Sequence, residues 1–224
     1  MVKPPHYVSA IQPYVPGKPV EELERELGIR DSVKLASNEN PLGPSPLVLK
    51  EIVNDLKNIG SSLSLNRYPD GNGYYLKQAL SMRLSVSEDE IILGNGSNEI
   101  IDIAVRTFLQ LGEEAVMAHP SFVVYSMATQ AQGARAIKIP LKQYGHDLEA
   151  MADALTPGTK IVFIANPNNP TGTMNTQAEF ERFMKRVPEG MGRAGYPDTQ
   201  NILKNVWSCR AQDWIRDWTK RHYC

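Results

Sequence analysis

From residue 88 onward, short apolar runs alternate with segments whose apolar residues recur at helical spacing. The runs predict strands at 90–93, 115–118, 134–139 and 160–165. The spaced segments predict helices over 97–109, 122–132, 148–155 and 176–187. Strands separated by helices of this length are typical of βαβ units. We therefore predict an α/β fold with three αβα layers around a mostly parallel sheet, and ligands at the carboxyl ends of its strands.

The N-terminal part of the chain has a different pattern. Proline stands at positions 4, 5, 13, 16 and 19, next to a short acidic helix predicted near 19–27, which is typical of an arm that lies over a surface. Apolar spacing then predicts helices over 44–57 and 74–84, separated by a turn. After Val187 no period is clear. We expect an N-terminal arm at 1–40, an α/β domain at 41–187 and an aberrant tail at 188–224.

Composition narrows the class of protein. The 224 residues are 42% apolar and 22% charged, with a formal net charge of -1, which is typical of a soluble globular protein and favours neither nucleic acid nor a membrane surface as a partner. No apolar run reaches the ~18 residues of a membrane span, and the first residues lack the apolar core of a signal peptide, so we predict a cytoplasmic protein. The two cysteines lie near the end and the four histidines are scattered, which argues against a disulfide framework and a zinc site.

Residues that could bind a ligand follow the predicted strands. Gly94 and Gly96 begin a predicted helix, which favours backbone N–H groups directed at an anion; the alternative is a glycine turn with Ser97 or Asn98 as N-cap. Phe122 follows the next strand and can cover the face of a flat ligand, or belong to the core.

A rigid pair of amides follows the last predicted strand. In the stretch IVFIANPNNPTG, prolines on either side of Asn168 and Asn169 restrict φ, and Gly172 frees the backbone afterwards. This arrangement predicts that the asparagine side chains are held in fixed directions at the carboxyl end of the strand.

Several motifs in order form a wider pattern. They are Asn38-Glu39-Asn40-Pro41-Leu42-Gly43-Pro44, Arg67-Tyr68-Pro69-Asp70-Gly71, Gly94-Asn95-Gly96-Ser97-Asn98-Glu99, Pro120-Ser121-Phe122 and Asn168-Asn169-Pro170-Thr171-Gly172. Together they resemble the fold-type-I aminotransferases that use pyridoxal phosphate, and within them the histidinol-phosphate aminotransferases, from about residue 7 to residue 187. The resemblance implies that 41–187 is an incomplete large, cofactor-binding domain.

The resemblance also implies roles for particular residues. Those implied to bind pyridoxal 5'-phosphate are Tyr68, Gly96, Ser97, Asn98, Phe122 and Asn169. Asn169 would donate to the 3′ oxygen of the cofactor, the segment 96–98 would hold its phosphate, and Tyr68 would reach that phosphate from the neighbouring subunit of a homodimer. Phe122 stands where the family usually has a tyrosine, so it keeps ring stacking and lacks the hydroxyl. Those implied to face a small-molecule substrate are Tyr14, Asn38 and Asn40.

The implied reaction is amino transfer between L-histidinol phosphate and 2-oxoglutarate in histidine biosynthesis. Alternatives are an aromatic aminotransferase, a threonine-phosphate decarboxylase of the same fold, or a truncated, non-catalytic fragment, because the arginines that discriminate substrates lie in the family's C-terminal domain, which we expect to be absent.

The family's later motifs are not found in the translated chain. Asp-Glu-Ala-Tyr and Thr-Phe-Ser-Lys would carry the ring-nitrogen partner and the Schiff-base lysine, so we predict that this chain has no catalytic lysine. Trp207, Trp214 and Trp218 stand at the spacing of glycines in the family's Gly-Leu-Ala-Gly-Leu-Arg segment, and a tryptophan codon displaced by one base reads as glycine. We therefore expect a frame-shifted tail; a natural, unrelated C-terminus is the alternative.

Overall fold

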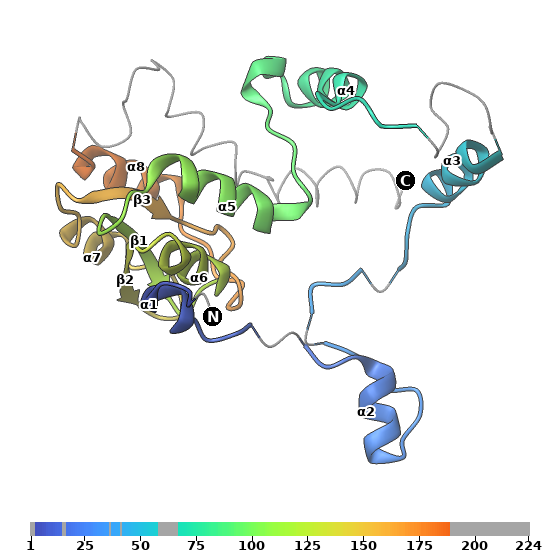
Figure 1. Cartoon of the computed structure of the whole chain (residues 1–224), viewed down its shortest axis with the longest axis horizontal. Coiled ribbons are helices and arrows are strands. Elements are labelled where there is room, and N and C mark those ends of the chain that lie inside the picture. The colour runs from blue at the N-terminus through green and yellow to red at the C-terminus, as the bar shows by residue number, and fades with distance from the viewer. Residues whose placement is uncertain (1–2, 15–16, 36, 41, 58–66, 189–224) are drawn as a thin grey trace. The chain divides into compact units, whose positions relative to one another are not determined.

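The computed structural model describes residues 3–14, 17–35, 37–40, 42–57 and 67–188, so nearly all of the predicted tail lies outside the described residues. The chain divides into two compact units (Figure 1). The described residues of Met1–Gln12 and Ile92–Cys224 form the sheet unit, and those of Pro13–Ile91 form the helical unit. The predicted domain boundaries stay a prediction.

Three parallel strands in the order β2-β1-β3 form the sheet. They are β1 (Glu114–His119), β2 (Arg135–Pro140) and β3 (Thr159–Phe163). β1 pairs with β2 in unbroken register, and its pairing with β3 shifts between Glu114 and Ala115. β1 is buried along its length up to His119, as expected of a central strand covered on both faces. These strands confirm the predictions at 115–118, 134–139 and 160–165.

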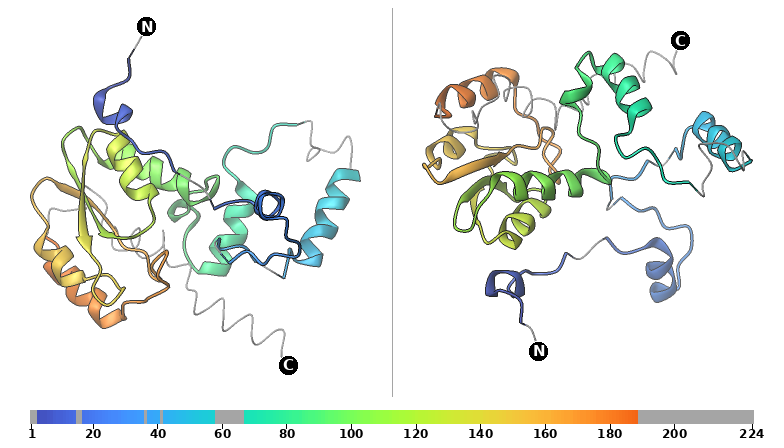
Figure 2. Two further views of the ribbon diagram at one scale, coloured as in Figure 1. Left: turned by 90° about the horizontal axis from the view of Figure 1, so that it is seen from below. Right: turned by 45° about the horizontal axis from the view of Figure 1, so that its top comes forward.

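Helices cover both faces of the sheet (Figures 1 and 2). One face carries α5 (Gly96–Phe108) and α6 (Val124–Ala131), and the other carries α7 (Leu148–Asp153) and α8 (Gln177–Arg186). Successive side chains of a strand point to opposite faces, so Ala115 and Met117 join the α5 and α6 core while Val116 and Ala118 join the α7 and α8 core. The three αβα layers and all four predicted helices of this region are confirmed.

Each of the four helices that cover the sheet buries part of its apolar face. In α5 the buried residues are Ile101 and Val105, one helical turn apart, and each large apolar side chain buried in this way contributes about 1.5–3 kcal/mol to folding. Asp147 caps the N-terminus of α7, because its carboxylate accepts a hydrogen bond from Ala150 N–H at 3.1 Å. α8 begins with a capping box between Thr176 and Glu179.

The connections place a topological switch point at one end of the sheet. The chain leaves β1 through α6 on one face to reach β2, then crosses back over β1 through α7 on the other face to reach β3, as right-handed crossovers require. After β3 it continues into α8, on the face opposite α6. The carboxyl ends of β1 and β3 therefore flank a topological switch point, where open α/β sheets bind ligands.

The predicted strand at 90–93 is wrong. Ser87 and Glu90 form a capping box around a short 3-10 helix, η1 (Glu88–Glu90), after which the chain runs extended from Ile91. No strand in the described part of the chain accepts its backbone hydrogen bonds. An apolar run becomes a strand only where a neighbouring strand pairs with it, and here the local capping box determines the structure instead.

The helical unit contains α2 (Val20–Leu27), α3 (Pro46–Lys57) and α4 (Tyr74–Leu84), all predicted from the sequence. None of the three has a buried residue. The first residues of the predicted arm belong to the sheet unit instead, where α1 (His6–Ser9) lies against α6 and the Gln130 side chain donates to the Tyr7 carbonyl at 3.0 Å. No helix in the described part of the chain is long and apolar enough to cross a membrane.

Candidate functional site

The loops that follow β1 and β3 lie side by side at the carboxyl end of the sheet. Asn168, from the loop after β3, directs its side-chain Nδ2 at the Pro120 carbonyl of the loop after β1, at 3.5 Å. Only 2% of Asn168 is exposed. The loop after β1 carries Phe122 and the loop after β3 carries Asn169, so two of the predicted ligand residues stand in loops that contact each other.

Asn168 organises its own loop. Its Nδ2 donates to Thr171 Oγ1 at 2.9 Å, its backbone N–H donates to the Thr173 carbonyl at 2.8 Å, and its carbonyl accepts from Gly172 N–H at 2.7 Å. Gly172 adopts φ of 70°, a left-handed conformation that glycine takes without steric cost. Asn168 is therefore buried inside the loop and is not available to a ligand.

Asn169 differs from its neighbour. It is only partly buried, and its side-chain amide has no hydrogen-bond partner among the described residues. A polar group held next to a rigid residue and left without a partner at a strand end is suited to bind a ligand atom. The two amides of the sequence motif thus have different surroundings: Asn168 is bonded within the loop, and the Asn169 side chain has no partner among the described residues. The ligand role of Asn169 stays a prediction.

Phe122 packs against Tyr125, which in turn packs against Phe163. Its ring meets Tyr125 edge to face at 5.6 Å between centroids, and Tyr125 stacks on Phe163 at 4.5 Å. Burial raises the pKa of Tyr125 to about 12, so this ring stays un-ionised. Phe122 itself is partly buried and lines a small hollow with His119, Ser121 and their neighbours. Part of the ring packs on the core and part is accessible, as stacking on a flat ligand would require.

The start of α5 is open to solvent. Its N-cap is Asn95, which corrects the alternative that Ser97 or Asn98 caps the helix. The Glu99 carboxylate accepts from Asn95 Nδ2 at 3.1 Å and from its backbone N–H, while residues 96–98 are exposed. A Cβ added at Gly94 would lie 2.7 Å from Ile100 Cδ1, so the Ile100 side chain would have to shift. The backbone N–H groups of Ser97 and Asn98 therefore remain available at the positive end of the helix dipole.

The remaining predicted site residues lie in the helical unit. Tyr14, Asn38, Asn40 and Tyr68 are all exposed. Asn40 makes a local turn, because its Oδ1 accepts from Leu42 N–H at 3.1 Å and its Nδ2 donates to the Gly43 carbonyl at 3.0 Å.

Tyr68 precedes a turn built on Asp70. Backbone N–H groups of Tyr74 and Asn72 donate to the Asp70 carboxylate and hold its pKa below the ordinary value. The turn presents the Tyr68 side chain to solvent. The substrate and phosphate roles of these residues remain predictions.

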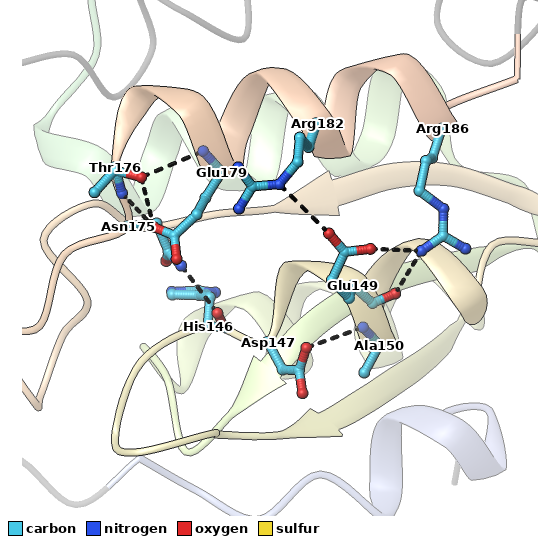
Figure 3. Close-up of polar contacts among 9 residues, drawn as sticks. All are labelled: His146, Asp147, Glu149, Ala150, Asn175, Thr176, Glu179, Arg182 and Arg186. Carbon is cyan, nitrogen blue, oxygen red and sulfur yellow. Dashed lines mark hydrogen bonds and ion pairs between the residues drawn. The ribbon is translucent and has the colours of Figure 1, made fainter.

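The sequence did not single out His146, which precedes α7 and is buried with 4% exposed. Its Nε2 lies 3.2 Å from Asn168 Oδ1. Its carbonyl accepts from Asn175 Nδ2 at 3.0 Å, as Figure 3 shows. Burial lowers the pKa of His146, against smaller opposing effects of Asn168 and the Ala165 carbonyl. In this segment only Asp147, a residue type that favours helix caps, is recognisable from the sequence. The contact between His146 and Asn168 joins residues 22 positions apart, so it leaves no local sequence pattern.

Ion pairs hold α8 against α7 beside this network (Figure 3). Arg186 Nη1 lies 2.9 Å from a Glu149 carboxylate oxygen, and Arg182 approaches the same carboxylate at 3.9 Å. These side chains are well exposed, so each pair contributes at most about 1 kcal/mol. They help to orient α8, the helix that follows the loop after β3.

Known proteins similar to this chain form a consistent group. Residues 30–191 match the sequence model of the family described as aminotransferase class I and II. The histidinol-phosphate aminotransferase of Moorella thermoacetica is 51% identical over 181 residues, which are 81% of this chain and 45% of that protein. The histidinol-phosphate aminotransferase 2 of Hydrogenovibrio crunogenus is 50% identical over 187 residues, 84% of this chain and 48% of that protein. The chain thus spans about half the length of the curated relatives it matches.

Solved structures show the same fold. A histidinol-phosphate aminotransferase from Sinorhizobium meliloti, in complex with pyridoxal-5'-phosphate, superposes with a TM-score of 0.70 at 24% identity, over 84% of this chain and 48% of that one. A histidinol-phosphate aminotransferase from Clostridium acetobutylicum gives a TM-score of 0.56 at 29% identity, over 67% of this chain and 42% of that one.

Proposed function

The chain belongs to the class I and II aminotransferase family, and on that premise we propose that it binds pyridoxal 5'-phosphate at the carboxyl ends of β1 and β3. We propose further that the reaction served is amino transfer between L-histidinol phosphate and 2-oxoglutarate in histidine biosynthesis, in the cytoplasm and in a homodimer. The names and the identity of the relatives support this reaction.

One observation carries the proposal: the loop that carries Asn169, whose side-chain amide has no partner among the described residues, contacts through Asn168 the loop that carries the partly buried Phe122, at the switch point of the sheet. Asn169 Nδ2 would donate to the 3′ oxygen of the cofactor and Phe122 would cover one face of its ring. The exposed N–H groups of Ser97 and Asn98 would hold the phosphate. When bound, pyridoxal phosphate supplies the electron sink that transamination needs.

The residues at this site have separate tasks. Asn169 and Phe122 orient a flat group, and the start of α5 anchors an anion. Phe122 has no hydroxyl, so it contributes stacking alone where the related enzymes usually carry a tyrosine. Tyr14, Asn38 and Asn40 would contact the small-molecule substrate, and Tyr68 of a neighbouring subunit would add a hydrogen bond to the phosphate.

We propose that the 224-residue chain binds the cofactor without turning over substrate by itself. The Ser-Lys motif that carries the family's Schiff-base lysine is not found in the translated sequence, and Lys185 and Lys204 stand in other contexts. Binding would then depend on hydrogen bonds and stacking, each contributing on the order of 1 kcal/mol.

Cofactor titration of the purified chain tests the proposal. We expect saturable binding, and we expect Asn169→Ala to raise the dissociation constant about fivefold, the equivalent of one hydrogen bond of ~1 kcal/mol. Asn54→Ala, an exposed asparagine of α3, serves as the matched control and should leave binding unchanged. Binding that does not saturate, or equal affinity in the two variants, would contradict the assignment of the site.

A further inference from the structure

His146 stands between β2 and α7, outside the loop that carries Asn169, yet its side chain reaches into that loop. The imidazole is buried, and its Nε2 lies 3.2 Å from Asn168 Oδ1. No motif assigned a role to this histidine, and the proposed function does not use it.

The hydrogen bond between His146 and Asn168 has a defined direction. Asn168 Nδ2 points at the Pro120 carbonyl, which can only accept, so the amide oxygen Oδ1 must face His146. With the amide in this orientation we assign the proton to Nε2, which then donates to Asn168 Oδ1 and leaves the buried Nδ1 without a partner among the described residues. Asn168 consequently has its oxygen satisfied by His146 and its nitrogen satisfied by Thr171 Oγ1 at 2.9 Å.

The segment around His146 holds the loop at further points. The His146 carbonyl accepts from Asn175 Nδ2 at 3.0 Å, and Asn175 N–H donates to Asn166 Oδ1 at 2.8 Å. Thr173 Oγ1 donates to the Tyr144 carbonyl at 2.7 Å. These bonds hold the flanks of the loop, whereas His146 Nε2 and the Pro120 carbonyl approach the Asn168 side chain from outside the loop, at 3.2 and 3.5 Å.

We propose that His146 is a positioning residue for the Asn169 amide: by donating to Asn168 it holds the segment 166–172 in the conformation that directs Asn169 at its ligand. The ligand role of Asn169 rests on the proposed function, but the conformational role of His146 does not. Without the imidazole donor, Asn168 Oδ1 becomes a buried acceptor without a partner, and the loop can satisfy it only by opening to water.

Hydrogen exchange of the full 224-residue chain tests the conformational step without cofactor. In His146→Leu we expect the Gly172 amide, which donates to the Asn168 carbonyl at 2.7 Å, to exchange about tenfold faster, while the amides of β1 change less than about twofold. In His146→Gln, whose side-chain nitrogen can still donate to Asn168, protection should return. Asn168→Ala removes the same bond from the other side and replaces His146→Leu if that variant does not fold.

Two exchange results would overturn the proposal. Unchanged exchange at Gly172 in both disrupting variants would mean that the histidine does not support the loop. Equally faster exchange in β1 and in the loop would mean that the histidine stabilises the whole sheet and has no local role.

A double-mutant cycle with pyridoxal phosphate as the probe tests the link to Asn169. We expect His146→Leu to raise the dissociation constant about fivefold in the unmodified chain and less than about twofold in the Asn169→Ala background. An equal effect in both backgrounds would refute positioning through Asn169. If Asn169→Ala binds like the unmodified chain, the cofactor assignment fails instead, and the exchange experiment still decides the role of His146.

Discussion

Glu114 is a buried carboxylate at the start of the central strand. Its replacement should lower the free energy of unfolding of the sheet unit more than replacement of an exposed charged residue does. Only 7% of its side chain is exposed. One carboxylate oxygen faces Arg135 Nη2, and the other accepts from the hydroxyls of Thr156 and Thr159. Glu114 therefore ties β1 to β2 and to the loop before β3, at the point where the register between β1 and β3 shifts.

The magnitude follows from these contacts. Hydroxyl hydrogen bonds to a buried carboxylate contribute about 2 kcal/mol together. The Arg135 side chain is 67% exposed, so solvent screening limits the ion pair to about 1 kcal/mol. We therefore expect Glu114→Ala to lower the free energy of unfolding by about 3 kcal/mol, and Glu114→Gln, which keeps the shape and one acceptor oxygen, to lower it by about half as much.

Urea unfolding followed by far-UV circular dichroism measures this effect. At a typical slope the midpoint of Glu114→Ala should fall by about 1–2 M. The neighbouring Glu113 is the matched control: it accepts from Gln110 N–H at 2.7 Å and approaches Lys160 at only 3.8 Å, so Glu113→Ala should cost no more than about 1 kcal/mol. A Glu114→Ala midpoint within error of Glu113→Ala would refute the reasoning.

Two further predictions concern His146 and the lysines. Because burial holds the pKa of His146 below its ordinary value of 6.5, the unfolded chain takes up a proton below that pH that the folded chain does not, so the free energy of unfolding should fall as the pH drops below 6.5. Urea unfolding at a series of pH values should show this dependence weakened in His146→Gln; an identical dependence would exclude the histidine as its source. Treatment with borohydride in the presence of pyridoxal phosphate should reduce no single lysine onto the cofactor, because the ammonium group of a solvent-exposed lysine is mostly protonated at neutral pH and is a poor nucleophile. A stoichiometric adduct at one lysine, located by peptide mass spectrometry, would show that the chain completes a catalytic site.

Much of the fold was predictable from local pattern. The helix predicted over 74–84 begins and ends at the predicted residues, and the strand around Val116 was recognisable as a short apolar run. Apolar spacing predicts such elements because each helix or strand must bury one face, and this requirement fixes which of its successive residues are apolar. The failure at 90–93 marks the limit of this reasoning, since a strand also needs a partner that the run itself does not specify.

The candidate site, like the fold, was only partly predictable from the sequence. The sequence alone determined that a rigid, asparagine-containing loop follows a strand, that an aromatic residue follows another, and that a glycine turn opens a helix, because prolines, glycines and apolar runs act on their own neighbours in the chain. The tertiary structure alone shows that Asn168 is buried, that Asn169 is partly buried with no side-chain partner among the described residues, and that His146 contacts Asn168. Those contacts join groups 22 and 48 positions apart that meet only when parallel strands bring their carboxyl ends to one edge of the sheet.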